Sequence, residues 1–414
     1  LNNIYSDVEY GWNMRGPGYQ TGVFAGETTM TKGAQLPEYC NGTFSPGSLE
    51  DNRGHLTWRH FNNIQKLNIF LEKITDLPGN FNDAEKEKLS SEVNILVGEA
   101  LFLRALFYTD ICRSYGGVPI LKNSTQLGDD FSAITRSSFE ETVNFIDDDL
   151  QEAINLLPLK SNSEMGRANK EAAMGLRSRL LLFAASDLTA DGTAENEYVG
   201  YLNPNREELW RKAKLAAKEL IDLGTIRLAD FGAPDKEAVS QNYFSFFKTK
   251  TLDNPEVLWG KMHRADVGTR IRTNQWNGPN GIDNWGNNSP YGNVADRYQM
   301  ADGSDFFDHF SVNSNGEYKN ISSKFKDPNP YKFREPRFYA TMLFDSARWQ
   351  KRFDDLAGID PEGIYDRRTR VVIENGKVIS ERFGLDTRQG PVSPANGNYT
   401  GYILKKFMDD DVIG

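Results

Sequence analysis

The sequence lacks the long apolar runs and clustered positive charge that would indicate two broad classes of protein. No stretch of about twenty consecutive apolar residues occurs, so no segment is predicted to span a membrane. The chain has 48 Lys and Arg against 58 Asp and Glu, with a net charge of −10 and no basic stripe. Because nucleic acid binding requires clustered positive charge, nucleic acid is not an expected partner.

Residues that bind metals or form disulfides are scarce, with 2 cysteines and 4 histidines among 414 residues. Cys112 lies in a helical pattern and is expected to be a small buried residue, and spacing alone does not establish a disulfide with Cys40. His55 and His60 lack the i, i+4 spacing of a helical metal pair, and the other histidines stand alone. No nucleophile-elbow, P-loop or C-x-x-C motif is present. We therefore predict no metal and no cofactor.

What the sequence does contain is enough apolar and aromatic material for a large core, at 38% and 12% of residues. A chain of 414 residues exceeds the size at which one core usually stops growing, so two regions or one elaborate domain are expected.

The strongest helical pattern runs over residues 92–119. Its apolar residues recur every three or four positions over about six turns, which predicts a helix packed on more than one side. Gly116 and Gly117 supply a helix end, and Pro119 prevents the helix from resuming.

The apolar periodicity predicts four further helices, over residues 57–77, 138–157, 167–187 and 203–224. Ser138 and Glu141 form a capping-box sequence, and Asn203-Pro204 reads as a cap followed by proline at the first helical position. The 167–187 segment is rich in small residues, which permits close helix packing. Trp58 and Trp210 lie on apolar stripes and are expected in the core.

These patterns predict a mainly α protein of two regions. Residues 1–224 are expected to form a helical scaffold that resembles tetratricopeptide repeats, with an N-terminal loop region. Residues 225–414 are expected to form a loop-rich, ligand-facing region. Short strands are predicted there at residues 257–261, 338–344, 371–374 and 402–407.

Several stretches, in this order, resemble the SusD/RagB family of surface nutrient-binding lipoproteins from Bacteroidetes-like bacteria. They are EALFLRA at 99–105 with Tyr108, YGGVP at 115–119, GRANK at 166–170, YQMADG at 298–303, EPRFYAT at 335–341 and TGYILKKF at 400–407. Each is weak alone, but together they span nearly the whole chain.

The resemblance implies extracellular capture of oligosaccharide or polysaccharide by a lipid-anchored outer-membrane protein at the cell surface. It also implies a partner, a SusC-like TonB-dependent transporter. Relative to that family, the sequence lacks the lipoprotein signal and first helix at its start, and the closing helices after residue 407. The lipid anchor is therefore an implication of the resemblance alone.

The candidate ligand site is the ring-rich loop over residues 274–291. Sugars present apolar C–H faces ringed by hydroxyls, so they need flat aromatic platforms beside amides and carboxylates. The candidate platforms are Trp276, Trp285 and Tyr291, with Asn274, Asn280 and Asp283 as polar partners. Tyr39 and Phe44 are candidates for the same face. The alternative is that the tryptophans only pin the loop.

Polar residues of the family motifs are predicted to be structural instead. Arg104, Tyr108 and Arg167 should satisfy buried carbonyls or carboxylates between helices. The acidic runs at 147–149 and 409–411 are interpreted as solvated charge, with calcium binding as the alternative for the second.

The sequence leaves four hypotheses for the function of the chain. Non-catalytic glycan capture leads, and a peptide-capturing variant of the same family is the alternative. A glycoside hydrolase would need two flanking carboxylates, for which Asp283, Asp296, Asp302 and Asp305 are candidates. A cytoplasmic helical scaffold is disfavoured because it has no use for the loop-rich second half.

Overall fold

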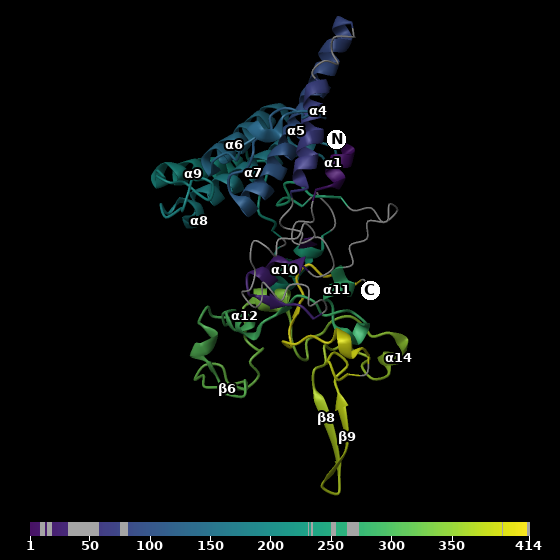
Figure 1. The fold of residues 1–414 in the computed structure, drawn as a ribbon. Helices are drawn as coiled ribbons and strands as arrows, with labels where there is room; N and C mark the ends of the chain where they lie inside the picture. Colours follow the sequence, from purple (N-terminus) through teal and green to yellow (C-terminus); the bar gives the residue numbers. More distant parts are fainter. Residues whose placement is uncertain are drawn as a thin grey trace. The chain divides into compact units, whose positions relative to one another are not determined.

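The chain forms two compact units that are interleaved in sequence (Figure 1). The computed structural model describes residues 1–8, 13–14, 19–31, 58–74, 82–230, 232, 235–249, 254–262, 273–390 and 392–411. Unit 1 comprises Leu1–Tyr10, Leu49–Ala229 and Thr251–Met262. Unit 2 comprises Gly11–Ser48, Asp230–Lys250 and His263–Gly414. The boundary predicted at residue 224 thus falls inside unit 1.

Unit 1 is a stack of helices in which each one packs on the next: α4 on α5, α5 on α6, α6 on α7, and α7 on α9 (Figure 1). Its helices are α1 (Asn2–Ser6), α4 (His60–Ile74), α5 (Asp83–Tyr115), α6 (Phe139–Leu156), α7 (Lys170–Ala185), α8 (Asp187–Ala190) and α9 (Arg206–Asp222), with short 3-10 turns η3 (Phe131–Ala133) and η4 (Lys160–Asn162).

The helices of unit 1 begin and end at residues whose chemistry favours a helix terminus. Ser138 and Glu141 form the predicted capping box of α6. Gly116 ends α5 with a φ of 78°. A Cβ atom on Gly116 would lie 2.0 Å from the carbonyl oxygen of Tyr198. Both the positive φ and this close contact therefore require glycine here. The cap predicted for α9 is wrong: Asn205 caps it, and Pro204 lies outside the helix.

The predicted hub is confirmed, although α5 begins nine residues before position 92. Leu103, Phe107 and Tyr108 on α5 are almost completely buried in the main core. The closest contact at Gly175 of α7 is with a non-helical segment: a Cβ there would lie 2.5 Å from Leu258, and 3.9 Å from Leu220 on α9.

Two core predictions in unit 1 are wrong. Trp58 is 47% exposed because it precedes α4 and stacks at the surface on Phe61 and Tyr115. Trp210 is 43% exposed on α9, and among the other long helices of the unit α9 packs chiefly on α7, which leaves part of its apolar stripe uncovered.

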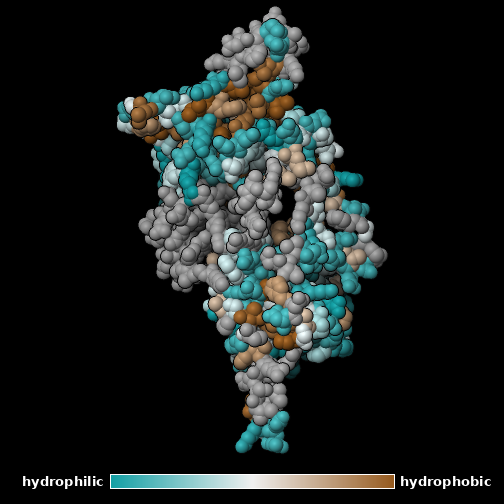
Figure 2. Space-filling view, turned by 90° about the vertical axis from the view of Figure 1, so that its right-hand side faces the viewer, coloured by the Kyte–Doolittle hydropathy of each residue, from teal (hydrophilic) through white to brown (hydrophobic). Residues whose placement is uncertain are grey.

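Hydrophobic side chains also gather on the surface over the helices of unit 1 on the face shown in Figure 2. Several large ones are exposed near the α7–α9 end of the unit, among them Leu188 and Leu202. None of the described helices is long and apolar enough to cross a membrane.

Unit 2 is built from short elements joined by long loops. Its helices are α2 (Thr21–Phe24), α10 (Lys236–Lys248), α11 (Thr273–Asn277), α12 (Gly292–Asp296), α13 (Pro336–Thr341) and α14 (Asp354–Ala357), with 3-10 turns η6 (Asn280–Ile282), η7 (Phe306–Asp308) and η8 (Pro394–Asn396). Its strands are β1 (Asn13–Met14), β2 (Tyr19–Gln20), β3 (Thr28–Thr29), β4 (Ser289–Pro290), β5 (Phe310–Val312), β6 (Tyr318–Asn320), β7 (Met342–Leu343), β8 (Thr369–Glu374), β9 (Lys377–Phe383) and β10 (Ile403–Leu404).

The strands described in unit 2 pair in antiparallel twos: β1 with β2, β3 with β4, β5 with β6, β7 with β10, and β8 with β9. The β8–β9 hairpin projects from the rest of its unit (Figure 1). Most of these pairs are local, but β3–β4 joins Thr28–Thr29 to Ser289–Pro290 and so ties an early loop to the candidate site.

The strand predictions are mixed. Residues 371–374 lie in β8, and β10 occupies part of 402–407. The segment 257–261 is not a strand, and 338–344 is mostly helix α13 followed by the short strand β7. Proline at the first position of α13 favours a helix start there. The overall class is as predicted: a mainly α, tetratricopeptide-like scaffold with a loop-rich second part that contains short strands.

Candidate functional site

The candidate loop folds back on itself. Backbone amides of Trp285, Gly286 and Asn287 donate to the carbonyls of Gln275, Gly278 and Trp276, at 2.8, 2.9 and 3.0 Å. Trp276 and Trp285 therefore lie on neighbouring, hydrogen-bonded segments of one loop. The structure places the backbones of these two predicted platforms side by side, and both residues are half-buried.

Tyr291 and Asp283 lie at two further places on this loop. The backbone N–H of Tyr291 donates to the carbonyl of Glu27 at 3.0 Å, directly beside the β3–β4 pair, and its ring is half-buried. Asp283 is exposed with a φ of 56°, and its carboxylate accepts a 3.3 Å hydrogen bond from Asn396. Tyr39 and Phe44 lie outside the described residues.

Asn274 and Asn280 support the loop from within. The Asn274 amide group donates to the Asp409 carbonyl at 2.6 Å and accepts from the Asp409 N–H at 3.0 Å. Asn280 is 2% exposed, and its amide donates to the carbonyl of Thr387 at 3.1 Å. These bonds place both side chains in the support of the loop rather than on its surface.

The loop also holds buried polar atoms that lack a hydrogen-bond partner among the described residues. They are the indole Nε1 of Trp276, Oδ1 of Asn280, Nδ2 of Asn284 and Oδ1 of Asn288. Buried polar groups are nearly always paired in folded proteins, so this density of unpaired groups is unusual. These unpaired atoms lie inside the loop rather than on its surface.

The polar motif residues of α5 are structural, as predicted. Arg104 is 7% exposed and binds Asp149 through two parallel hydrogen bonds of 2.7 Å, while its third nitrogen donates to Asn68 at 2.9 Å. Tyr108 donates to the carbonyl of Pro119 at 3.3 Å and accepts from the N–H of Leu121 at 2.8 Å.

Arg167 is also structural, as predicted. Its Nε lies 3.3 Å from the Glu99 carboxylate, and its guanidinium lies over the ring of Tyr5. Tyr5 itself donates to Glu99 at 3.0 Å and accepts from the N–H of Ala168 at 3.0 Å. Burial raises the pKa of Glu99, while Arg167 and Tyr5 oppose that shift.

The interpretation of residues 147–149 as solvated charge is wrong for two of the three. Asp149 is buried against Arg104, and Asp147 lies 2.6 Å from Arg177 between α6 and α7. These carboxylates face neighbouring helices because they compensate arginines that the helix packing buries.

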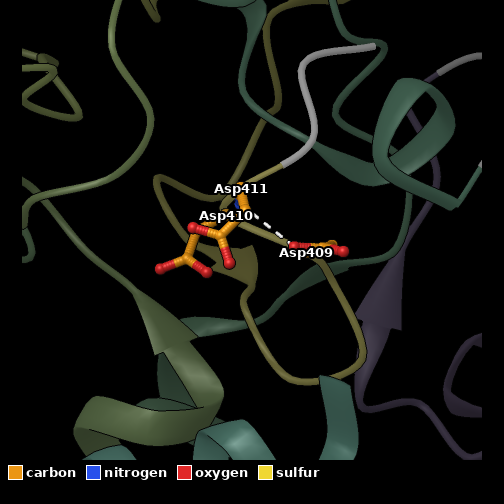
Figure 3. A group of neighbouring side chains, drawn as sticks. All are labelled: Asp409, Asp410 and Asp411. Carbon is orange, nitrogen blue, oxygen red and sulfur yellow. Dashed lines mark hydrogen bonds between the residues drawn. The ribbon is translucent and has the colours of Figure 1, made fainter. Parts of the chain in front are cut away.

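The second acidic run, Asp409 to Asp411, is a cluster of three neighbouring carboxylates (Figure 3). Lys248 is its basic partner. The Lys248 ammonium lies 3.7 Å from Asp409, 2.8 Å from Asp411, and in contact with Asp410. Burial opposes protonation of Lys248, but hydrogen bonds to Asp410 and Asp411 outweigh it and raise the lysine pKa. Only Asp411 is largely exposed, so solvated charge describes that residue alone. The cluster is charge-compensated by a protein cation.

The carboxylates considered for hydrolysis have separate partners. Asp296 accepts a 2.7 Å hydrogen bond from Tyr318, and burial raises its pKa against that bond. Lys324 and Ser304 hold Asp302 and lower its pKa. Asp305 is exposed at the start of η7.

A cavity of about 410 Å³ lies beside Tyr291, within unit 2. Three elements form it: the turn before β3, helix α12 with the residues that follow it, and the start of α13. The charged residues that line it are Glu27, Arg297, Glu335 and Arg337, and the uncharged ones include Asn293, Val294 and Tyr298.

Backbone hydrogen bonds fix the walls of this cavity. The Tyr291–Glu27 bond holds the turn against the start of α12. The N–H of Glu335 donates to the Gln299 carbonyl at 2.9 Å, and the N–H of Gln299 returns a 3.2 Å bond to the Glu335 carboxylate. The other Glu335 oxygen accepts from Arg337 at 2.5 Å.

Sequence reasoning missed this cavity. Tyr298, Glu335 and Arg337 belong to the family-like segments at 298–303 and 335–341, and those segments were read only as signatures. Glu27 could not be placed, because it reaches the cavity through pairing between strands more than 250 positions apart.

Comparison with protein families gives two matches in the expected order. Residues 45–182 match a family described as starch-binding associating with outer membrane, and residues 255–413 match the SusD family. Among curated proteins, no sequence matches.

Solved structures give a consistent result for the fold. A SusD-like protein from Bacteroides fragilis is 22% identical with a TM-score of 0.65, over 99% of this chain and 67% of its own. A SusD-like carbohydrate-binding protein from the same species is 16% identical with a TM-score of 0.62, over 99% and 67%. A SusD superfamily protein from Bacteroides vulgatus is 15% identical with a TM-score of 0.51, over 76% and 61%.

Proposed function

The chain belongs to the SusD family, and on this premise we propose that it is a non-catalytic glycan-binding protein that captures oligosaccharide or polysaccharide for uptake. The observation that carries the proposal is the match of residues 45–182 to a family described as starch-binding and associated with the outer membrane. A relative of the same fold is named a carbohydrate-binding protein.

The proposed binding surface is the doubled loop that contains Trp276 and Trp285, with Tyr291 beside it. Two rings on adjacent segments can stack on the C–H faces of sugar units. Asp283 is exposed and can accept further hydroxyl hydrogens, whereas Asn274 and Asn280 hold the loop in shape.

The proposal includes location and partner. The protein acts at the cell surface of the outer membrane, held by a lipid anchor, and passes its glycan to a SusC-like TonB-dependent transporter. The family's association with the outer membrane supports this arrangement. The anchor and the transporter rest on the family resemblance alone.

The test is affinity electrophoresis and calorimetry against a panel of polysaccharides that includes starch. The wild type is compared with the double variant Trp276→Ala, Trp285→Ala. Trp210→Ala is the matched control because this tryptophan is also partly exposed but lies on α9. We expect one glycan to bind, the double variant to lose at least about tenfold in affinity, and the control to keep it.

Each other result has a definite meaning. If the folded wild type binds no glycan but binds peptides, the peptide-capturing alternative replaces this proposal. If reducing ends are released from the bound glycan, the protein is a hydrolase. Equal losses in the double variant and in Trp210→Ala would contradict the assigned loop while leaving glycan binding in place.

A further inference from the structure

The cavity beside Tyr291 contains side chains that are free to bind a ligand. Glu27, Asn293 and Arg297 all line it and are exposed. Among the described residues, none of these three side chains forms a hydrogen bond or an ion pair. An exposed arginine and glutamate that line one cavity without pairing leave both groups available to a third partner.

The charges of the lining indicate what kind of ligand fits. Arg337 and Glu335 neutralise each other through their 2.5 Å contact. One positive group, Arg297, and one negative group, Glu27, remain. An anionic ligand would be attracted by Arg297 but repelled by Glu27, so the balance favours a ligand without net charge.

Sugar hydroxyls match this pair of groups chemically. A hydroxyl can donate its hydrogen to the carboxylate and accept from a guanidinium N–H at the same oxygen. Two adjacent hydroxyls can therefore be shared between Glu27 and Arg297. Asn293 adds a donor and an acceptor, while Val294 and the ring of Tyr298 provide apolar wall for the C–H face.

The Tyr298 ring is fixed in position. It packs edge-on against Phe338 with ring centres 5.7 Å apart, and its backbone carbonyl accepts a 2.7 Å bond from the buried Arg334. A wall held in this way is pre-organised for binding.

The volume indicates how much of a ligand the cavity can hold. At about 410 Å³ it lies near the lower end of the range for small-molecule sites, roughly 300–1,000 Å³. This is room for one or two sugar rings. Through the Tyr291–Glu27 hydrogen bond it adjoins the proposed aromatic loop.

We propose that this cavity binds a neutral sugar unit of the captured glycan, with hydroxyls shared between Arg297 and Glu27. The inference rests on the proposed function, because it assumes that the ligand is a glycan. It makes the cavity a specificity subsite that selects an uncharged sugar unit, while the loop tryptophans bind neighbouring units.

The test uses saturation-transfer NMR and calorimetry with glucose, galactose, mannose, xylose and their disaccharides at millimolar concentration. Glucuronate and glycylglycine serve as anionic and zwitterionic probes. The variants are Arg297→Ala and Glu27→Gln, and Arg348→Ala is the matched control because its side chain is exposed and paired with Glu362. All three are surface changes, and thermal unfolding verifies that each variant folds.

We expect at least one neutral sugar to bind the wild type and the control. Both cavity variants should lose about 10- to 100-fold in affinity, the size expected for hydrogen bonds to charged groups. Binding of a polysaccharide by the loop should persist in both cavity variants, although weakened.

Four results would overturn the inference. Polysaccharide binding that depends on the tryptophans but not on Arg297 or Glu27, with no binding of short sugars, would remove the subsite and keep the proposed function. Preference for glucuronate that becomes stronger in Glu27→Gln would show that the cavity binds anions instead. Glycylglycine binding lost in both variants would assign it to peptide ends. If no glycan of any length binds the folded protein, the proposed function itself fails, and this inference with it.

Discussion

The two units differ in whether their buried polar side chains have hydrogen-bond or ion-pair partners. In unit 1 the buried charged side chains Glu99, Arg104 and Asp149 all have close partners, and most of these partners lie on neighbouring helices. Each buried side-chain polar atom without a partner among the described residues lies in unit 2, and several of them lie in the loop of Trp276. The buried charged groups of unit 1 are thus paired within the unit, whereas unit 2 contains buried side-chain polar atoms without a partner among the described residues.

This difference separates the residues that maintain the fold from those that can meet a ligand. The family-like motifs of unit 1 are occupied by internal contacts, so their chemistry is structural. The loop and cavity of unit 2 present rings and free polar groups on a frame held by short strand pairs. Helices form the scaffold, and loops held on it are where binding residues are usually found.

The largest effect is expected from breaking the buried pair in unit 1. Arg104→Ala leaves Asp149 buried without its cation, so the free energy of unfolding should fall by about 3–5 kcal/mol, measured by denaturant titration. Arg211→Ala, which breaks the exposed Arg211–Glu208 pair, should leave the free energy of unfolding almost unchanged, because solvent screens this pair. Similar losses of unfolding free energy in both variants would contradict the conclusion that unit 1 depends on its buried charge pair.

A smaller effect is expected from Asn274→Ala in unit 2. The substitution removes both hydrogen bonds to the Asp409 backbone, so the free energy of unfolding should fall by about 1–3 kcal/mol. Asn315→Ala, in the exposed turn between β5 and β6, is the control and should change little. If Asn274→Ala reduced glycan affinity at unchanged stability, Asn274 would be a ligand contact after all.

The smallest effect concerns the pH dependence of Glu99. Burial raises the pKa of Glu99 in the folded protein above its ordinary 4.5. The folded state therefore binds this proton more tightly than the unfolded chain, and stability is gained as the pH falls toward 4.5. Relative to Glu99→Gln, the wild type should become more stable between pH 7 and 4.5 in denaturant titrations.

Glu141 provides a comparison of opposite sign. Hydrogen bonds from Ser138 lower the pKa of Glu141, so the wild type should lose stability relative to Glu141→Gln as the pH falls below 4.5. Equal pH profiles for the two glutamine variants would contradict the assignment of these environments.

Sequence reasoning was effective where local chemistry decides the structure. The capping box at Ser138, the glycine end of α5 and the helical periodicities depend on residues within a few positions of one another. It failed where a neighbour far away in sequence decides. Trp58 carries a core-like pattern but lies at the surface, and Asp149 sits in an acidic run but is buried by Arg104.

The candidate site shows the same division. The composition of residues 274–291 indicated a ring-rich loop, and that loop does bring Trp276 and Trp285 onto adjacent segments. Which polar side chains face outward could not be predicted, because the partners of Asn274 and Asn280 lie more than 100 positions away.

The sequence by itself determined the mainly helical scaffold and the family, because periodicity, caps and motif order are properties of short segments. The tertiary structure alone decided the cavity of Glu27 and Arg297 and the burial of each polar group. These depend on contacts such as the β3–β4 pairing, which joins residues far apart in the chain, and no local pattern specifies such a contact.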